Sequence, residues 1–120
     1  MRKLLIIYII FLIITESIYQ ILNRPQIKIL NWGPKNAQSN TYFNINDQNS
    51  YIWISTNKQI PKGSYLMWGG NKINITIEKD KPVITANIDK EYYNEKGTYY
   101  IQIISPETRE KSNKIPFPVN

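Results

Sequence analysis

The sequence from about residue 26 onward predicts an all-β fold, an antiparallel β-sandwich of about seven or eight short strands. Short runs of β-branched and aromatic residues alternate with polar ones, the pattern of strands that bury one face. Clusters of Gly, Pro, Asn and Asp separate these runs, as turns between strands require. No amphipathic helical pattern lies between them, although residues 91–93 could form one helical turn. An apolar helix is expected only before the sandwich, in residues 1–22.

Six runs carry the alternating pattern. In residues 73–77, the clearest run, three isoleucines are expected to face the core, with Asn74 and Thr76 facing outward. The other runs, with the residues expected to face inward, are 26–29 (Ile27 and Ile29), 42–45 (Phe43 and Ile45), 84–88 (Ile84, Ala86 and Ile88), 99–103 (Tyr99, Ile101 and Ile103) and 115–119 (Ile115, Phe117 and Val119).

The last run has a proline at every second position, Pro116 and Pro118. Because proline has no backbone N–H to donate to a ladder, this strand is expected at an edge or with pairing on one side only. Such prolines also discourage the addition of a further strand.

The N-terminus has the features of an export segment. Arg2 and Lys3 precede the apolar run 4–14, and a basic start followed by ~7–15 apolar residues is typical of a secretory signal. A membrane span usually needs ~18 or more residues, which residues 4–22 provide only if their polar members are tolerated. The length favours a cleaved signal, whereas the poor cleavage site after the run favours a retained anchor. Both interpretations remain open for residues 1–22.

Either interpretation exports the domain at residues 26–120. It would lie in the periplasm, or on the outer face of the inner membrane with a single N-terminal span. In a retained span, Glu16 would be the ionisable residue, and such residues tend to face a partner helix or water. Glu16 is therefore a candidate for docking within the membrane.

The composition excludes most catalytic and metal chemistry. The chain of 120 residues has neither cysteine nor histidine, which removes Ser-His-Asp and Cys-His systems and nearly all zinc and copper sites. Asp89, Glu91 and Glu95 are the nearest approach to a carboxylate cluster, but they surround a predicted corner rather than a pocket. The net charge of +6 comes from scattered lysines rather than from a nucleic-acid-binding stripe. We therefore expect no enzyme, no cofactor and no nucleic-acid partner.

One local motif resembles a known family of folds. The segment Glu95-Lys96-Gly97-Thr98-Tyr99 is similar to the turn that opens strand F of immunoglobulin-like domains, where a tyrosine hydroxyl bonds back to the preceding corner. More broadly, residues 26–119 resemble the IPT/TIG-like branch of these folds in bacterial surface proteins. That resemblance rests on an opening strand, Asn31-Trp32-Gly33-Pro34, a Gly69-Gly70 hairpin and Gly97-Thr98-Tyr99. It implies an immunoglobulin-like sandwich that binds, spaces or docks, and not a catalyst.

Aromatic side chains are the best candidates for recognition, because they combine flat apolar faces with polar groups. Their alternative role is to fill the core and its ends. Both faces of the strand around Trp53 are apolar, so one of them needs cover, which a partner could supply. The candidates are Trp32, Trp53, Trp68, Tyr51 and Tyr65.

Two functions fit these features. The first is a non-catalytic binding or scaffolding module that docks on another envelope or membrane protein, with residues 4–22 adding a membrane contact if they are retained. The second is a carbohydrate-binding module for envelope glycans, which rests on the Trp and Tyr content.

Overall fold

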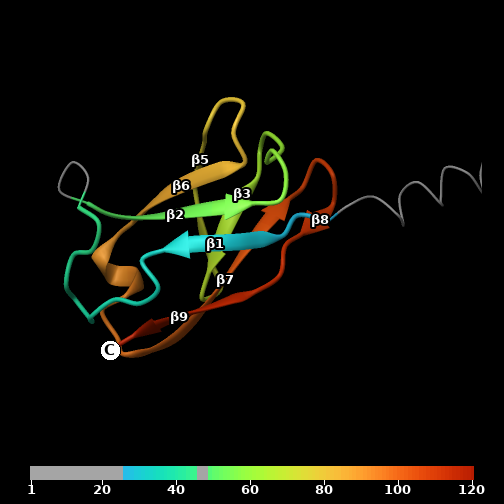
Figure 1. Cartoon of the computed structure of the whole chain (residues 1–120). Coiled ribbons are helices and arrows are strands. Elements are labelled where there is room, and N and C mark those ends of the chain that lie inside the picture. Colours follow the sequence, from blue (N-terminus) through green and yellow to red (C-terminus); the bar gives the residue numbers. More distant parts are fainter. Residues whose placement is uncertain (1–25, 46–48) are drawn as a thin grey trace, which may run out of the picture.

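Two antiparallel β-sheets face each other across an apolar core in the computed structural model of this chain (Figure 1). The structure describes residues 26–45 and 49–120. The expected helix of residues 1–22, with Glu16, lies outside the described residues. Within the described ranges, no helix is long and apolar enough to cross a membrane.

The first sheet has the strand order β1-β2-β6-β5. Its strands are β1 (Ile29–Gly33), β2 (Ser50–Thr56), β6 (Val83–Ile88) and β5 (Thr76–Ile77). Ile52 and Ile54 of β2 face the core, and Ile84, Ala86 and Ile88 of β6 do the same, which confirms the inward face predicted for residues 84–88. Ile27 and Ile29 are also buried as predicted.

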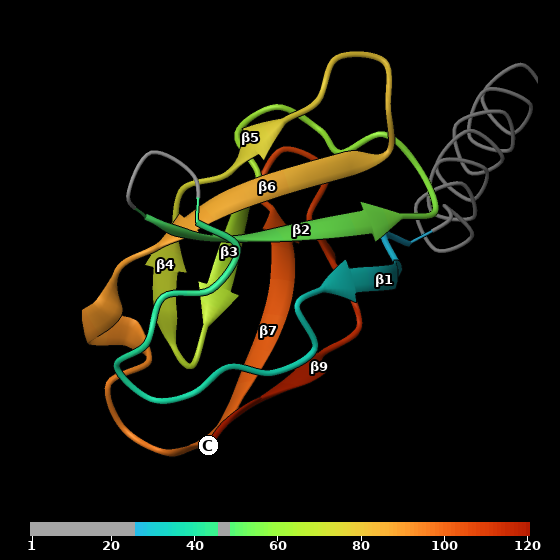
Figure 2. The ribbon, with the colours of Figure 1, turned by 60° about the vertical axis from the view of Figure 1, so that its left-hand side comes forward.

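The second sheet has the order β4-β3-β7, with β8 and β9 following one another along the far side of β7. Its strands are β4 (Asn71–Ile73), β3 (Tyr65–Trp68), β7 (Gly97–Ser105), β8 (Glu110–Lys111) and β9 (Ile115–Val119). A single turn of 3-10 helix, η1 (Lys90–Tyr92), precedes β7, close to the predicted helical turn. Figure 2 shows β2 and β6 lying across β3 and β7, with the strands of the two sheets inclined to each other.

A bulge separates β8 from β9. Ile104 pairs with Lys111 and Ile101 pairs with Ile115, so the register shifts by one residue between these pairs. Ser112 satisfies the backbone at this point, because the Ile103 N–H donates to Ser112 Oγ at 2.8 Å while the Ser112 N–H donates to the Ile103 carbonyl at 2.9 Å. Bulges of this kind keep the paired groups satisfied while one strand gains a residue.

The strand β9 lies at an edge, as its prolines predict. It pairs with β7 on one side. On the other side it meets the segment after β1, where Ala37 forms an isolated parallel bridge with Val119. The Ala37 N–H donates to the Pro118 carbonyl at 3.0 Å, and the Asn120 N–H donates to the Ala37 carbonyl at 2.9 Å. The chain therefore crosses from the first sheet to the second and covers this edge.

The run 73–77 is not one strand, which corrects the sequence prediction. Ile73 ends β4 in the second sheet, and Thr76 begins β5 in the first. The predicted alternation still holds, because Ile73 is buried, Ile75 and Ile77 are half-buried, and Asn74 and Thr76 are exposed. Both sheets face the same core, so the pattern of inward residues does not change when the chain moves from one sheet to the other.

The predicted strand at residues 42–45 does not form. Phe43 is buried, but Ile45 is 67% exposed, and no ladder includes this segment. Phe43 is held instead through Ser50, whose Oγ accepts the Phe43 N–H at 2.9 Å. The described residues form nine strands rather than the seven or eight expected, because the run 73–77 divides between two strands and the last edge contains both β8 and β9.

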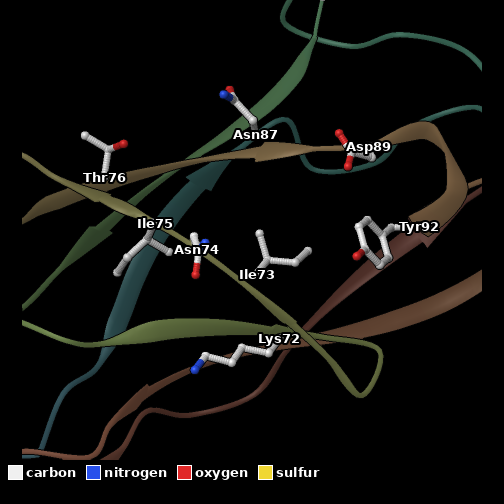
Figure 3. A pocket seen from close by; sticks show the side chains of 8 residues that line it. All are labelled: Lys72, Ile73, Asn74, Ile75, Thr76, Asn87, Asp89 and Tyr92. Carbon is white, nitrogen blue, oxygen red and sulfur yellow. The ribbon is translucent and has the colours of Figure 1, made fainter.

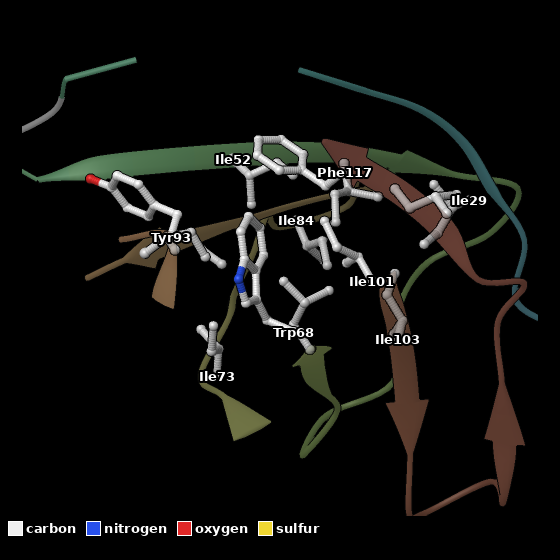
Figure 4. Close-up of a cluster of buried hydrophobic side chains, with 14 of the residues drawn as sticks. Ile29, Ile52, Trp68, Ile73, Ile84, Tyr93, Ile101, Ile103 and Phe117 are labelled. Carbon is white, nitrogen blue, oxygen red and sulfur yellow. The ribbon is translucent and has the colours of Figure 1, made fainter. Parts of the chain in front are cut away.

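Large aromatic rings fill the centre of the core (Figure 4). Trp68 is fully buried, and its ring centroid lies 4.8 Å from that of Phe117 and 6.0 Å from that of Tyr99. Its indole N–H donates to the Tyr92 carbonyl at 2.9 Å. Tyr93 is also fully buried. These rings join the second sheet to the segment that carries η1.

Asparagine side chains hold the first described residues in place. The Lys28 N–H donates to Asn57 Oδ1 at 2.7 Å, and the Ile29 N–H donates to Asn113 Oδ1 at 2.7 Å. An amide side chain has the same kinds of donor and acceptor as a peptide group. The backbone N–H groups of Lys28 and Ile29 are therefore hydrogen-bonded at the point where β1 begins. The start of the sandwich is thereby fixed to loops at residues 57 and 113.

Tyr99 forms the predicted tyrosine corner, because its hydroxyl donates to the Glu95 carbonyl at 2.8 Å. Tyr99→Phe is expected to lower the free energy of unfolding by about 1 kcal/mol, the usual net value of one intramolecular hydrogen bond. Tyr100→Phe is the matched control, since Tyr100 is 58% exposed and its hydroxyl makes no hydrogen bond within the described chain. Urea denaturation of both variants measures the difference, and equal midpoints would show that the corner contributes nothing.

Candidate functional site

A cluster of mostly apolar side chains covers the outer face of the second sheet. Leu66, Trp68, Ile101 and Ile103 are buried, so the residues that alternate with them point outward. The outward residues are mostly half-buried, and we call them together the β3–β7 face: Tyr65, Met67, Tyr100, Gln102 and Ile104.

The strand register makes this face continuous. Tyr65 pairs with Ile104 and Met67 pairs with Gln102, so the side chains of the two strands lie side by side. Tyr100 is the most exposed member, at 58%, and it pairs with Pro116 of β9. An exposed tyrosine beside half-buried apolar residues is the composition that protein interfaces favour at their centres.

Lysines surround the β3–β7 face. Lys72 of β4 pairs with Met67, Lys111 of β8 pairs with Ile104, and Lys114 lies just before β9. The Lys72 Nζ lies 4.6 Å from the centroid of the Tyr65 ring, a cation–π contact. None of the outward-pointing residues on the described strands of this sheet is acidic. The face is therefore apolar at its centre and positively charged at its margin.

A groove of about 400 Å³ opens in this face beside the hairpin between β3 and β4. The hairpin residues Gly69 and Gly70 have positive φ angles of 53° and 89°, which glycine adopts without strain. A Cβ atom on Gly69 would also lie 2.8 Å from the Tyr99 ring. Because neither residue has a side chain, the groove stays open between Met67 and Tyr100.

The tryptophans and tyrosines predicted for recognition do not form one site. Tyr65 belongs to the β3–β7 face. Tyr51 and Trp53 are half-buried on the opposite side of the molecule, on the outer face of the first sheet. This confirms the prediction that the strand around Trp53 has two apolar faces, since Ile52 and Ile54 point into the core while Trp53 points outward.

Trp53 owes its position to a glycine. It pairs with Gly33 of β1, and its indole ring occupies the space that a Cβ atom on Gly33 would need. The other two tryptophans lie in different surroundings. Trp32 is half-buried under Lys35, whose Nζ lies 3.6 Å from the ring centroid. Trp68 is fully buried, so its proposed recognition role is corrected to a core position.

Sequence reasoning missed most of the β3–β7 face. Its signal was present in the run 99–103, whose outward positions include Tyr100 and Gln102. The pairing of β3 with β7 adds Met67 and Ile104, and no sequence pattern predicts which two strands will be neighbours.

The described acidic residues form no candidate metal centre. Asp89, Glu91 and Glu95 are exposed, and within the described part of the chain no group of three acidic side chains could hold a metal ion. Burial raises the pKa of Tyr93, partly offset by its 2.6 Å hydrogen bond with Ser50 Oγ. Tyr93 thus stays protonated and serves the core.

Comparison with models of known protein families gave no match to this chain, and a sequence search of curated proteins also gave none.

Proposed function

We propose that this chain is a non-catalytic immunoglobulin-like module that docks on another envelope protein through the β3–β7 face. The fold assignment is supported by strand order. The first sheet, β1-β2-β6-β5, corresponds to strands A, B, E and D of an immunoglobulin domain, and β3, β7 and β9 correspond to C, F and G. The tyrosine corner at Tyr99 lies at the start of the strand that corresponds to F.

The observation that carries the docking proposal is the apolar, lysine-bordered β3–β7 face. Tyrosine and methionine are enriched in protein interfaces, while lysine is kept to their polar margins. Tyr100 and Met67 flank the groove, so a partner side chain could enter between them. The surrounding lysines favour a partner whose surface is acidic, because opposite charges accelerate encounter and fix orientation.

The edges of the sandwich favour docking on a face over strand addition. In β1, Leu30 is an extra residue in a bulge opposite β2. The strands β4 and β5 contain only three and two residues. The prolines and the Ala37 bridge protect β9. Short, bulged or proline-containing edges resist pairing with another chain.

Site-specific photo-crosslinking in the producing cells tests this proposal. A photoreactive phenylalanine analogue at Tyr100 is expected to capture an exported or membrane protein, and the same analogue at Tyr42 is the control. Tyr42 is also an exposed tyrosine, at 47%, but it lies outside the β3–β7 face. Identification of the captured protein by mass spectrometry should show an acidic docking surface.

Charge reversal provides the second arm of this test. Lys111→Glu with Lys114→Glu should lower the crosslinking yield at Tyr100 several-fold, and added salt should lower the wild-type yield as screening increases. Equal capture at Tyr42 and Tyr100, or a yield that charge reversal leaves unchanged, would contradict docking through this face.

Glycan binding remains the second candidate function. Stacking of sugars on a platform of tryptophans has little support, since Trp68 is buried and Trp32 is covered by Lys35. Trp53 offers part of its ring on the outer face of the first sheet, away from Trp32 and Trp68. A separate polar pocket provides a better reason to consider sugars.

A further inference from the structure

A polar pocket of about 410 Å³ opens where the chain passes from the second sheet to the first (Figure 3). The chain leaves β4 after Ile73 and enters β5 at Thr76. In the described structure β5 pairs with β6 only at Ile84 and Thr85, so the edge of β6 beyond them, residues 86–88, has no partner from β5. The pocket lies beside this unpaired edge. Its volume falls within the ~300–1,000 Å³ typical of small-molecule sites.

Most polar side chains around the pocket have no partner among the described residues. The side chains of Asn74, Thr76, Asn87, Asp89 and Tyr92 make no hydrogen bond or ion pair with any part of the chain that the structure describes. Figure 3 shows Asp89 and Tyr92 at one end of the pocket and Thr76 at the other. Five unused polar groups from three separate segments therefore border one hollow.

Asp89 is the one acidic side chain that lines the pocket, and it is exposed. It occupies the N-cap position of η1, where an aspartate normally accepts a hydrogen bond from the helix backbone. Its side chain makes no such capping bond. Lys72 also lines the pocket, but its ammonium group lies over the Tyr65 ring and forms no ion pair with Asp89 among the described residues. The Asp89 carboxylate is thus free to accept hydrogen bonds from a ligand.

We infer that this pocket binds a neutral, hydroxyl-rich ligand, namely a sugar unit. Hydroxyl groups donate to a carboxylate and both donate to and accept from amides, which matches Asp89, Asn74 and Asn87. The half-buried Ile75 supplies an apolar surface for the C–H face of a sugar ring. The Asp89 charge disfavours anionic ligands. This site is distinct from the β3–β7 face, so the inference does not depend on the docking proposal.

Saturation-transfer NMR on the full chain tests the inference. The protein should be held in a detergent without a sugar head group, and glucose, galactose, mannose, N-acetylglucosamine and glucuronate should be offered separately at millimolar concentration. At least one neutral sugar is expected to receive saturation, with glucuronate weaker than glucose. Asp89→Asn should weaken that binding about ten-fold, as expected for loss of a hydrogen bond to a charged group.

Two further variants make the outcome specific. Asn87→Ala should also reduce binding several-fold, because it removes an amide that lines the pocket. The fold should tolerate the change, since Asn87 is exposed and contributes no contact to the core. Tyr100→Ala, on the β3–β7 face, should leave sugar binding unchanged. Circular dichroism melting of each variant checks that the fold is retained. The inference is overturned if no neutral sugar receives saturation, or if the signal survives Asp89→Asn and Asn87→Ala in folded protein.

Discussion

Trp68→Ala is expected to lower the free energy of unfolding by about 3–5 kcal/mol, the range for removing a large buried aromatic side chain. Trp68 is fully buried at the centre of the core, in contact with Phe117. The change would leave a cavity between the two sheets and would also leave the Tyr92 carbonyl without the indole N–H that it accepts. A loss of this size is a large part of the ~5–15 kcal/mol that stabilises a typical domain.

Trp53→Ala is the matched control for this prediction. Trp53 is the same residue type on the outer face of the first sheet, where it is only half-buried. Its removal should cost about 1 kcal/mol, since a partly exposed ring loses less apolar contact and leaves no closed cavity. Thermal or urea denaturation of the two variants compares them directly. Similar losses from both would mean that Trp68 is not the central packing residue that the structure indicates.

The contrast between the two tryptophans also shows what the sequence could predict. Alternation around Trp53 indicates a strand with two apolar faces, and the structure confirms it. For Trp68 the sequence allowed two roles, recognition of a partner and packing in the core, and the periodicity of the sequence could not distinguish them. The decision depends on β3 pairing with β7, because that pairing places Trp68 beside Ile101 over the centre of the core. Such long-range contacts are not encoded in any local pattern.

The alternation of inward and outward side chains was predicted more reliably than the continuity of each strand within one sheet. Residues 84–88, 99–103 and 115–119 form strands with the predicted inward faces. Residues 73–77 keep the predicted alternation but change sheets at Asn74 and Ile75. The local pattern reports which side of the backbone meets apolar surroundings, and both sheets share those surroundings. It cannot report which neighbouring strand supplies the hydrogen bonds.

The same limit applies to the candidate sites. The polar pocket exists because the chain changes sheets at residues 74–75, and that event brings Asn74 near Asn87 and Asp89. In the sequence these residues appeared as outward positions of two strands and as part of a corner. Their meeting depends on sheet topology, so sequence reasoning had no means to join them.

Glu110→Gln is expected to lower the free energy of unfolding at neutral pH by about 1.5–3 kcal/mol, the range for hydrogen bonds to a charged group. Glu110 is 2% exposed, although it is a carboxylate, and its short strand β8 lies beside the first described residues of the domain. Its Oε2 accepts the Ile27 N–H at 3.1 Å and lies 2.6 Å from Lys58 Nζ. The carboxylate therefore holds the first described residues to the second sheet. Glutamine keeps the shape but cannot pair with the Lys58 charge.

The pH dependence of stability separates this charge effect from a packing effect. Burial raises the pKa of Glu110, but hydrogen bonds from Lys58 and Thr108, the Lys58 charge and the Ile27 N–H together outweigh it and lower the pKa below its ordinary value of 4.5. A carboxyl group whose pKa is lower in the folded state stabilises the fold above the unfolded value, and this contribution is lost as the pH falls through the folded pKa. The wild type should therefore lose stability on acidification below about pH 4.5.

In Glu110→Gln the corresponding part of the pH dependence should be absent. The two proteins should differ most at neutral pH, and their curves of unfolding free energy against pH should converge in acid. Glu107→Gln is the control, because Glu107 is an exposed acid in the neighbouring turn and makes no ion pair or hydrogen bond within the described chain. It should follow the wild type throughout. A constant difference between Glu110→Gln and the wild type at every pH would show that Glu110 acts through packing and not through its charge.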